Sequence, residues 1–229
     1  MDLYGQKSRS IPQKIVIILL ELILLWLSYW ILFQKGGAII LGWLGIHSIH
    51  ALAARKAVVF IFSLVVFIRI GFAMFYLLKR KIPWEESFSI PMAFALYYVG
   101  FSLLVLQTDH RLDLLDLFGI ALFLFGSFLN SYSEIQRHQW KILTENKGKL
   151  FTGGLFRYSM HINYFGDVCW VTAYAILTRN WYSAIIPVFL LCFFIFFNIP
   201  KLDQYLEMKY GKSFFEFKKK TKKLIPFIY

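Results

Sequence analysis

The stretch GLFRYSMHINYFGD, residues 154–167, places arginine, histidine, asparagine, aspartate, two glycines and two tyrosines between long apolar runs. The flanking runs decide the fold class, because 59% of the 229 residues are hydrophobic and 20% are aromatic. A long apolar stretch with few charges is typical of a transmembrane helix. The sequence therefore predicts an all-α, polytopic membrane helix bundle with 6 to 7 transmembrane helices.

Seven stretches are candidates for spans: 15–33, 36–54, 56–78, 89–107, 114–130, 165–178 and 182–199. Segment 36–54 is the weakest, since it contains His47, Ser48 and His50, and it either spans the bilayer or forms a re-entrant or interfacial segment. The first apolar run is long enough to span, and no small-residue cleavage site follows it. We therefore do not expect a cleavable signal peptide.

Lysine and arginine set the expected orientation. They crowd into residues 79–81, 137–157 and 201–223, and the net charge is +12. Because basic connections favour the cytoplasmic side, these segments and the C-terminus are predicted to be cytoplasmic. The basic residues fall where anionic lipid headgroups would lie, not on one soluble face, so membrane lipids rather than nucleic acid are the expected partners. Oligomeric state is not predicted.

The segment NSYSEIQRHQWK, residues 130–141, is expected to continue the preceding span as a helix. It carries polar residues on one side, spaced four, three, one and three apart: Asn130, Glu134, Arg137, His138 and Lys141. The helix after the loop begins with a second polar face, made of His161, Asn163, Tyr164 and Asp167. Two polar faces at one membrane depth predict a pocket open to the cytosol, with a solvated helix end as the alternative.

The residue types present and the motifs that are missing exclude several classes of ligand. The five histidines are few and scattered, and Cys169 and Cys192 lie in apolar runs, so no metal site is expected. No GxGxxG follows a strand and no GxxxxGK[ST] occurs, which excludes soluble nucleotide-binding folds. The mixture of amides, carboxylates, tyrosine, lysine and histidine can hydrogen-bond ribose, amide and phosphate groups of a large polar cofactor.

Three segments in order, GKLFTGGLFRYSMHINYFGDVCW (148–170), LDQYLEMKYG (202–211) and KKLIPFIY (222–229), resemble the C-terminal domain of the steroid 5-alpha-reductase family. NSYSE (130–134) resembles that family's Asn-x-x-Ser-Asp signature, with Glu134 in place of the aspartate. The resemblance predicts a division into residues 1–110, the N-terminal spans on the substrate side, and residues 111–229, the reductase-like domain with a cytoplasmic cofactor pocket.

The resemblance implies an integral membrane oxidoreductase that acts on CH-CH groups in lipid metabolism. Such an enzyme uses NADPH to reduce a carbon–carbon double bond conjugated to a carbonyl in a steroid-like or other lipid substrate. Cofactor-binding roles carry over to residues on both polar faces and the last helix: Asn130, Glu134, Lys141, Arg157, His161, Asn163, Tyr164, Asp167 and Tyr205.

Two departures from the family pattern affect this set. Many relatives read Ser-Arg-His-Pro-Asn-Tyr where this chain has Met160 and Ile162, and Arg157 is the candidate to supply the missing charge. Lys141 keeps the charge of an arginine that is usual in the family, but it lacks the bidentate fork.

A reductase of this kind also needs an acid or hydrogen-bond donor for the developing enolate, which the family takes from its N-terminal spans. Glu21 and Arg69 are the charges deepest in the predicted spans, and they can pair if both lie on the cytosolic side. Glu21 is therefore the candidate catalytic residue, with a structural ion pair or snorkelling groups as the alternative.

Two other functions stay open. One is an S-adenosylmethionine-dependent membrane methyltransferase of the isoprenylcysteine carboxyl methyltransferase type. His161, Tyr164 and Gly166 fit its pattern, whereas Met160, Ile162 and the Asp203-Gln204 pair do not. The other is a catalytically lapsed membrane protein of the same fold.

Overall fold

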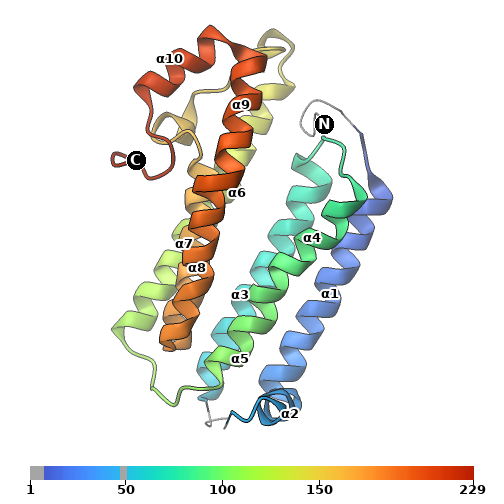
Figure 1. The fold of residues 1–229 in the computed structure, drawn as a ribbon, viewed down its shortest axis with the longest axis vertical. Coiled ribbons are helices and arrows are strands. Elements are labelled where there is room, and N and C mark those ends of the chain that lie inside the picture. Colours follow the sequence, from blue (N-terminus) through green and yellow to red (C-terminus); the bar gives the residue numbers. More distant parts are fainter. Residues whose placement is uncertain (1–7, 47–50) are drawn as a thin grey trace. The chain divides into compact units, whose positions relative to one another are not determined.

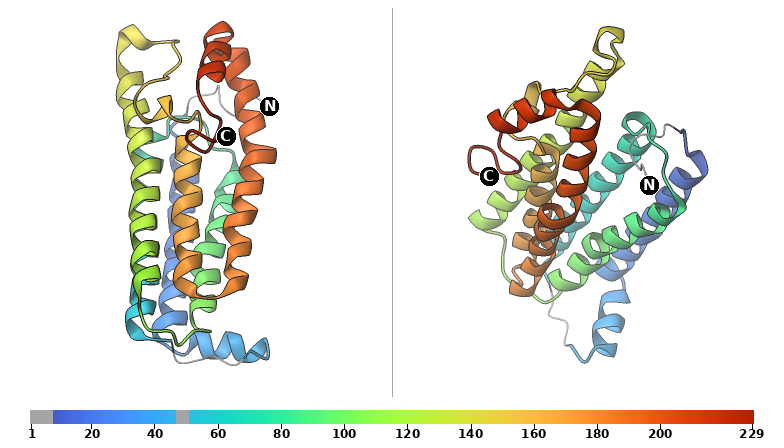
Figure 2. Two further views of the ribbon diagram at one scale, coloured as in Figure 1. Left: turned by 90° about the vertical axis from the view of Figure 1, so that its left-hand side faces the viewer. Right: turned by 45° about the horizontal axis from the view of Figure 1, so that its top comes forward.

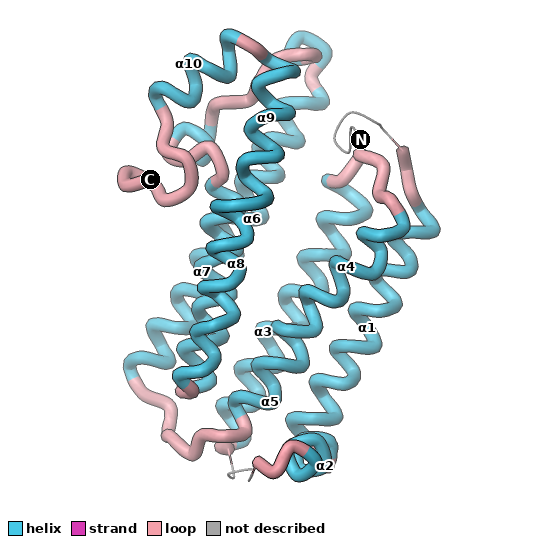
Figure 3. The backbone as a smooth tube through the Cα atoms, viewed as in Figure 1, coloured by secondary structure: helices cyan, strands magenta, loops and turns pink. Residues whose placement is uncertain are grey.

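The computed structural model describes residues 8–46 and 51–229. Most of these residues are helical, and within them the only β structure is isolated bridges such as that between Ser159 and Lys222 (Figure 3). The all-α prediction is confirmed. His47 and His50 lie outside the described residues.

The chain divides into two compact units. Unit 1 contains the described parts of Met1–Ala121 together with Val171–Ile186, and unit 2 contains Leu122–Trp170 and Pro187–Tyr229. Unit 1 is built from α1 (Ile11–Phe33), α2 (Gly36–Trp43), α3 (Ala53–Phe72), α4 (Trp84–Ala95), α5 (Phe101–Val105) and the start of α6. The functional division predicted at residue 110 stays a prediction.

Unit 2 holds most of the reductase-like segments. It contains the longer part of α6 (Leu114–Ile142), the start of α7 (Ile162–Thr178), most of α8 (Ile185–Phe193), α9 (Ile199–Tyr210) and α10 (Lys212–Lys220). Short 3-10 turns occur at Thr144–Asn146, Gly154–Arg157 and Trp181–Ala184, the last of these in unit 1. Within unit 2, α6, α7 and the α8–α9 helix run side by side (Figures 1 and 2).

Five helices of the described chain are long and apolar enough to cross a membrane, which is the pattern of a multi-pass membrane protein. They are Ile11–Phe33, Ala53–Leu77, Trp84–Val105, Leu114–Ile142 and Trp181–Tyr210. The predicted number of six to seven spans is slightly higher. The eight residues of α2 reach about 12 Å, and the 17 residues of α7 about 26 Å, against a hydrocarbon core of about 30 Å.

Three of the long helices each contain a π-helical turn: Ala73–Leu77, Leu96–Gly100 and Phe194–Asn198. A π turn changes the direction of the side chains around it, and such turns are frequent at functional sites. Tyr98 of the second turn and Phe194 of the third are buried. Both residues adjoin the polar groups described below.

A buried ion-pair network joins the ends of three helices in unit 1. The Arg55 guanidinium, which is 0% exposed, donates to Asp116 Oδ1 at 2.6 Å and Oδ2 at 2.8 Å. It also donates to the carbonyl oxygens of His110, Arg111 and Leu177. Arg179 binds the same carboxylate, and its hydrogen bonds to Asp116 raise the pKa of the Arg179 guanidinium above its ordinary value. The network therefore holds α3, α6 and α7 together.

Basic connections gather at one end of each unit. In unit 1, Lys14 Nζ donates to the Leu78 carbonyl at 2.7 Å, and Ser10 Oγ accepts from the Ile82 amide at 3.0 Å, so the N-terminal segment meets the connection that contains 79–81. In unit 2, segment 148–157 lies against α9 and α10. Each unit thus has a basic end, and the cytoplasmic placement of these ends stays a prediction.

Candidate functional site

A backbone contact between α6 and α7 brings their polar faces together in unit 2. A Cβ on Gly166 would lie 2.6 Å from the Asn130 nitrogen and 2.7 Å from the Gly126 carbonyl oxygen. A Cβ on Gly126 would in turn lie 2.6 Å from the Gly166 oxygen. Only glycine permits this approach at both positions. The polar stripe of α6 therefore lies directly on the first two turns of α7.

Four predicted site residues form a hydrogen-bonded group, here called the amide–acid cluster: Asn130, Glu134, Asn163 and Asp167. Asn130 Nδ2 donates to Asp167 Oδ1 at 2.9 Å and to the Asn163 carbonyl oxygen at 3.2 Å. Asn163 Nδ2 donates to Glu134 Oε1 at 3.0 Å. All four side chains are half-buried, so they stay accessible to a ligand.

Two neighbours orient the carboxylates of the amide–acid cluster. Trp170 Nε1 donates to Asp167 Oδ1 at 2.8 Å, and Arg137 pairs with Glu134 one helical turn away. The Arg137 guanidinium also lies 5.4 Å from the centre of the Phe156 ring. Arg137 belonged to the predicted polar stripe, whereas Trp170 in an apolar run carried no signal.

His161 and Tyr164 form a second group beside the amide–acid cluster. The buried His161 ring places Nε2 2.8 Å from Asp203 Oδ1 and stacks on Tyr164 at 5.6 Å and 7°. Tyr164 stacks in turn on Phe194 at 4.5 Å and 13°. Because Asp203 occupies one nitrogen of the imidazole, the geometry places His161 as a support for Tyr164. Its predicted role in cofactor binding stays a prediction.

The C-terminal segment fixes the backbone of this second group. The Met160 amide donates to the Lys222 carbonyl oxygen at 2.8 Å, and the His161 amide donates to the Lys223 carbonyl oxygen at 3.1 Å. Ser159 Oγ donates to the Leu224 carbonyl oxygen at 2.7 Å. The KKLIPFIY motif therefore packs beside the HINYFGD motif, although 61 residues separate Lys222 from His161.

Three further predicted residues take no part in the hydrogen bonds and ring contacts given above. Lys141 is exposed in the last turn of α6, and Arg157 is exposed beside the Tyr158 ring. Tyr205 is half-buried in α9, and its hydroxyl accepts a hydrogen bond from Lys209 Nζ at 2.9 Å. Six of the nine predicted cofactor residues thus lie in the two groups described above.

Glu21 lies in the interior of unit 1 and is 0% exposed. Within the described part of the chain, both of its carboxyl oxygens and the hydroxyl of Tyr98 lack a hydrogen-bond partner. The Glu21 carboxyl and the Tyr98 hydroxyl lie close enough for the two side chains to interact. Arg69 does not donate to the Glu21 carboxyl, so the predicted pairing of these two side chains is not a hydrogen-bonded one. Tyr98 was not predicted, because a tyrosine in an aromatic-rich span is more often a packing residue.

Substitution of Gly166 by alanine is expected to lower the free energy of unfolding by about 1–3 kcal/mol, because overpacking must separate α6 from α7. The midpoint of thermal unfolding of the detergent-purified chain measures this loss. Gly42→Ala is the control, since no described atom lies within 4 Å of a Cβ on Gly42. Equal midpoints for the two variants would contradict the backbone contact.

The fold and the site define a multi-pass helical membrane protein with a hydrogen-bonded amide–acid cluster where two adjacent helices meet. The chain belongs to the family described as Protein of unknown function (DUF1295), which matches residues 79–221. The resemblance recognised in the sequence is confirmed by relatives that include steroid and sterol reductases.

Three curated relatives are similar over part of their length. The chain is 30% identical over 112 residues to 3-oxo-5-alpha-steroid 4-dehydrogenase 2 of Rattus norvegicus, which is 49% of this chain and 42% of that protein. It is 31% identical over 97 residues to Delta(14)-sterol reductase of Schizosaccharomyces pombe, 41% of this chain and 22% of that protein. It is 26% identical over 116 residues to Protein-S-isoprenylcysteine O-methyltransferase B of Arabidopsis thaliana, 48% of this chain and 59% of that protein. The chain therefore covers less than two thirds of each relative.

Proposed function

We propose that the protein is an NADPH-dependent membrane reductase of a carbon–carbon double bond conjugated to a carbonyl in a steroid-like or other lipid substrate. The observation that carries this proposal is the amide–acid cluster, whose four members come from the two motifs that resemble the steroid 5-alpha-reductase family. The reductases among the relatives support the same activity. The proposal places the basic end of unit 2 and the C-terminus in the cytoplasm, where NADPH is available.

The donor set of the cluster fits the polar half of such a cofactor. A carboxylate offers about four acceptor positions, so Glu134 and Asp167 can keep their internal bonds and still accept from ribose hydroxyls. Both hydrogens of Asn130 Nδ2 are used within the cluster, whereas the Asn163 amide keeps one hydrogen and its oxygen to present to a carboxamide or hydroxyl group. NADPH, when bound, supplies the hydride for the reduction. Within the chain, Trp170 and Arg137 hold the two carboxylates in orientation.

The substrate carbonyl is assigned to the polar groups buried in unit 1. A buried carboxyl and a phenol that lie beside each other, without a hydrogen bond of normal geometry to any described group, can bind a carbonyl oxygen and stabilise the negative charge that develops on it. Buried ionisable groups within membrane spans are commonly functional, because the bilayer penalises them. Glu21 and Tyr98 are accordingly proposed to orient and polarise the substrate.

Thermal unfolding of the detergent-purified chain tests the cofactor. NADPH at about 100 times its dissociation constant is expected to stabilise the folded state by about 2.7 kcal/mol, because it binds only that state. Asn163→Ala should abolish this stabilisation. Asn146→Ala, which removes an amide bonded only to the Trp140 carbonyl oxygen in the loop, is the control and should retain it. An NADPH response that survives Asn163→Ala would contradict the proposed site.

A methyltransferase is the second candidate, favoured by the match to the Arabidopsis thaliana enzyme over 116 residues. Parallel titrations with NADH and S-adenosylmethionine separate the two activities. Stabilisation by S-adenosylmethionine alone would replace the reductase by the methyltransferase. A chain that responds to none of the three compounds would fit a protein that kept the fold and lost catalysis.

A further inference from the structure

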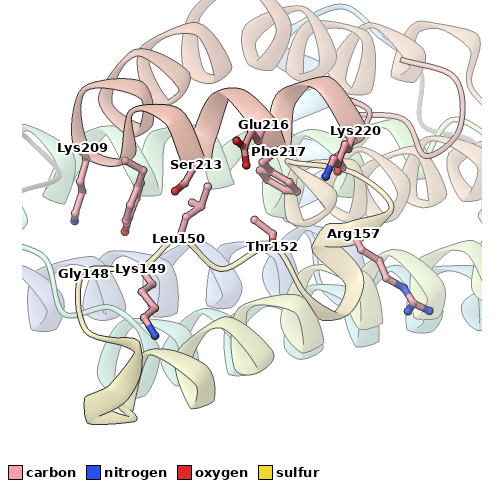
Figure 4. Close-up of a pocket in the computed structure, with 12 residues that line it drawn as sticks. Gly148, Lys149, Leu150, Thr152, Arg157, Lys209, Ser213, Glu216, Phe217 and Lys220 are labelled. Carbon is pink, nitrogen blue, oxygen red and sulfur yellow. The ribbon is translucent and has the colours of Figure 1, made fainter.

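A basic pocket of about 610 Å³ opens in unit 2, apart from the amide–acid cluster. One wall is the segment 148–157 and the other is formed by the end of α9 and by α10 (Figure 4). None of the four cluster residues lines this pocket. Arg157 is the one predicted cofactor residue in its wall.

The lining has the chemistry of a phosphate site. It carries four cationic side chains and one carboxylate, Glu216; the cations are Lys149, Arg157, Lys209 and Lys220. Lys149 and Arg157 belong to the loop wall, and Lys209 and Lys220 belong to the helical wall (Figure 4). Charge-assisted hydrogen bonds from lysine and arginine are the strong contacts to phosphate oxygens. The hydroxyls of Thr152 and Ser213 add neutral donors.

The position of the pocket along the last long helix points to the lipid headgroup layer. The helix Trp181–Tyr210 has 30 residues and is about 45 Å long, which matches the thickness of a bilayer with both headgroup layers. Lys209 and Tyr210, in its last turn, line the pocket. A helix of this length that spans the bilayer along its normal would place its last turn at the depth of the phospholipid phosphates.

The next helix has the character of an interfacial segment. In α10, Phe214 and Phe217 are buried against the rest of unit 2, whereas Phe215 is 52% exposed. Lys219 Nζ lies 4.5 Å from the centre of the Phe215 ring. Amphipathic helices with exposed aromatics and lysines lie in the plane of the interface. The leucine, tyrosine and phenylalanine in the pocket wall can contact the glycerol and upper acyl carbons of a lipid.

We propose that this pocket binds the phosphate of an anionic phospholipid headgroup. Lys149 and Lys220, one from each wall, hold the phosphate oxygens, and the apolar part of the wall receives the backbone of the lipid. The proposal does not depend on the reductase activity. The same side chains would also accept the phosphate of a soluble compound, so the test must separate the two sources.

The test is thermal unfolding of the full chain in detergent mixed with phosphatidic acid, phosphatidylglycerol or phosphatidylcholine. The two anionic lipids are expected to raise the midpoint in a saturable manner, and phosphatidylcholine is not. The double variant Lys149→Glu/Lys220→Glu should weaken the apparent lipid affinity at least about tenfold, through loss of two charge-assisted contacts. Lys147→Glu/Lys218→Glu makes the same change of net charge at exposed residues outside the pocket and should retain wild-type affinity.

Several results would overturn the proposal. An equal loss of lipid affinity in the two double variants would show that binding depends on general surface charge and not on the pocket. Stabilisation by inorganic phosphate or NADPH that depends on Lys149 and Lys220, without a response to the anionic lipids, would assign the pocket to a soluble phosphate. Asn163→Ala keeps the two proposals separate, because it should remove the NADPH response and leave the lipid response unchanged.

Discussion

Replacement of Arg55 by alanine is expected to lower the free energy of unfolding by about 3–5 kcal/mol, the usual cost of breaking a buried ion pair from one side. The substitution removes every donor that Arg55 supplies to Asp116 and to three carbonyl oxygens. Asp116, itself buried, then keeps, among the described residues, its bonds to Arg179 and to the Asp113 amide. The ends of α3, α6 and α7 should therefore separate at a lower denaturant concentration, or a lower temperature, than in the wild-type protein.

Arg80→Ala is the matched control for this prediction. Arg80 forms an ion pair with Glu86 in which both side chains are partly exposed, so its loss should cost no more than about 1 kcal/mol. Denaturation of both variants in detergent, followed by tryptophan fluorescence or circular dichroism, measures the difference. If Arg55→Ala is no more destabilised than Arg80→Ala, the network does not hold unit 1 together.

The amide–acid cluster could be predicted because its geometry is local to each helix. Asn130 and Glu134 are four residues apart, as are Asn163 and Asp167, and helical periodicity places each pair on one face. The glycine at position 166 permits the close approach of the two helices that the structure shows. The one step that needed tertiary structure was the contact of the two faces, which the sequence indicated only through their common membrane depth.

Other contacts depend on packing between distant segments. Arg55 and Asp116 are 61 residues apart, and His161 and Asp203 are 42 apart, so no periodic pattern links the partners. Tyr98 faces the interior from a π turn, which ordinary helical periodicity does not anticipate. The predicted number of spans exceeds the five long apolar helices of the described chain because hydropathy alone does not show where a helix ends. α2 stops at Trp43, within an apolar run that continues beyond it.

Conversion of Glu21 to glutamine should lower turnover by at least about a hundredfold while leaving the NADPH-induced thermal shift unchanged. Glutamine keeps the size of the side chain and can still donate a hydrogen bond, but it cannot transfer a proton. The variant therefore isolates the acid function from substrate positioning. The assay follows NADPH oxidation with lipid-soluble conjugated enones, beginning with a 3-oxo-4-ene steroid, and measures kcat and KM separately.

Tyr98→Phe and Glu85→Gln complete this experiment. Tyr98→Phe removes the buried phenolic hydroxyl beside Glu21. It should also lower kcat, because the developing oxyanion loses one hydrogen-bond donor. Glu85 is exposed in the first turn of α4, so its glutamine variant should behave as wild type. If Glu21→Gln turns over normally, the buried carboxyl has a structural role and the substrate carbonyl binds elsewhere. A fall in kcat with an intact cofactor response, in contrast, would locate the carbonyl at Glu21.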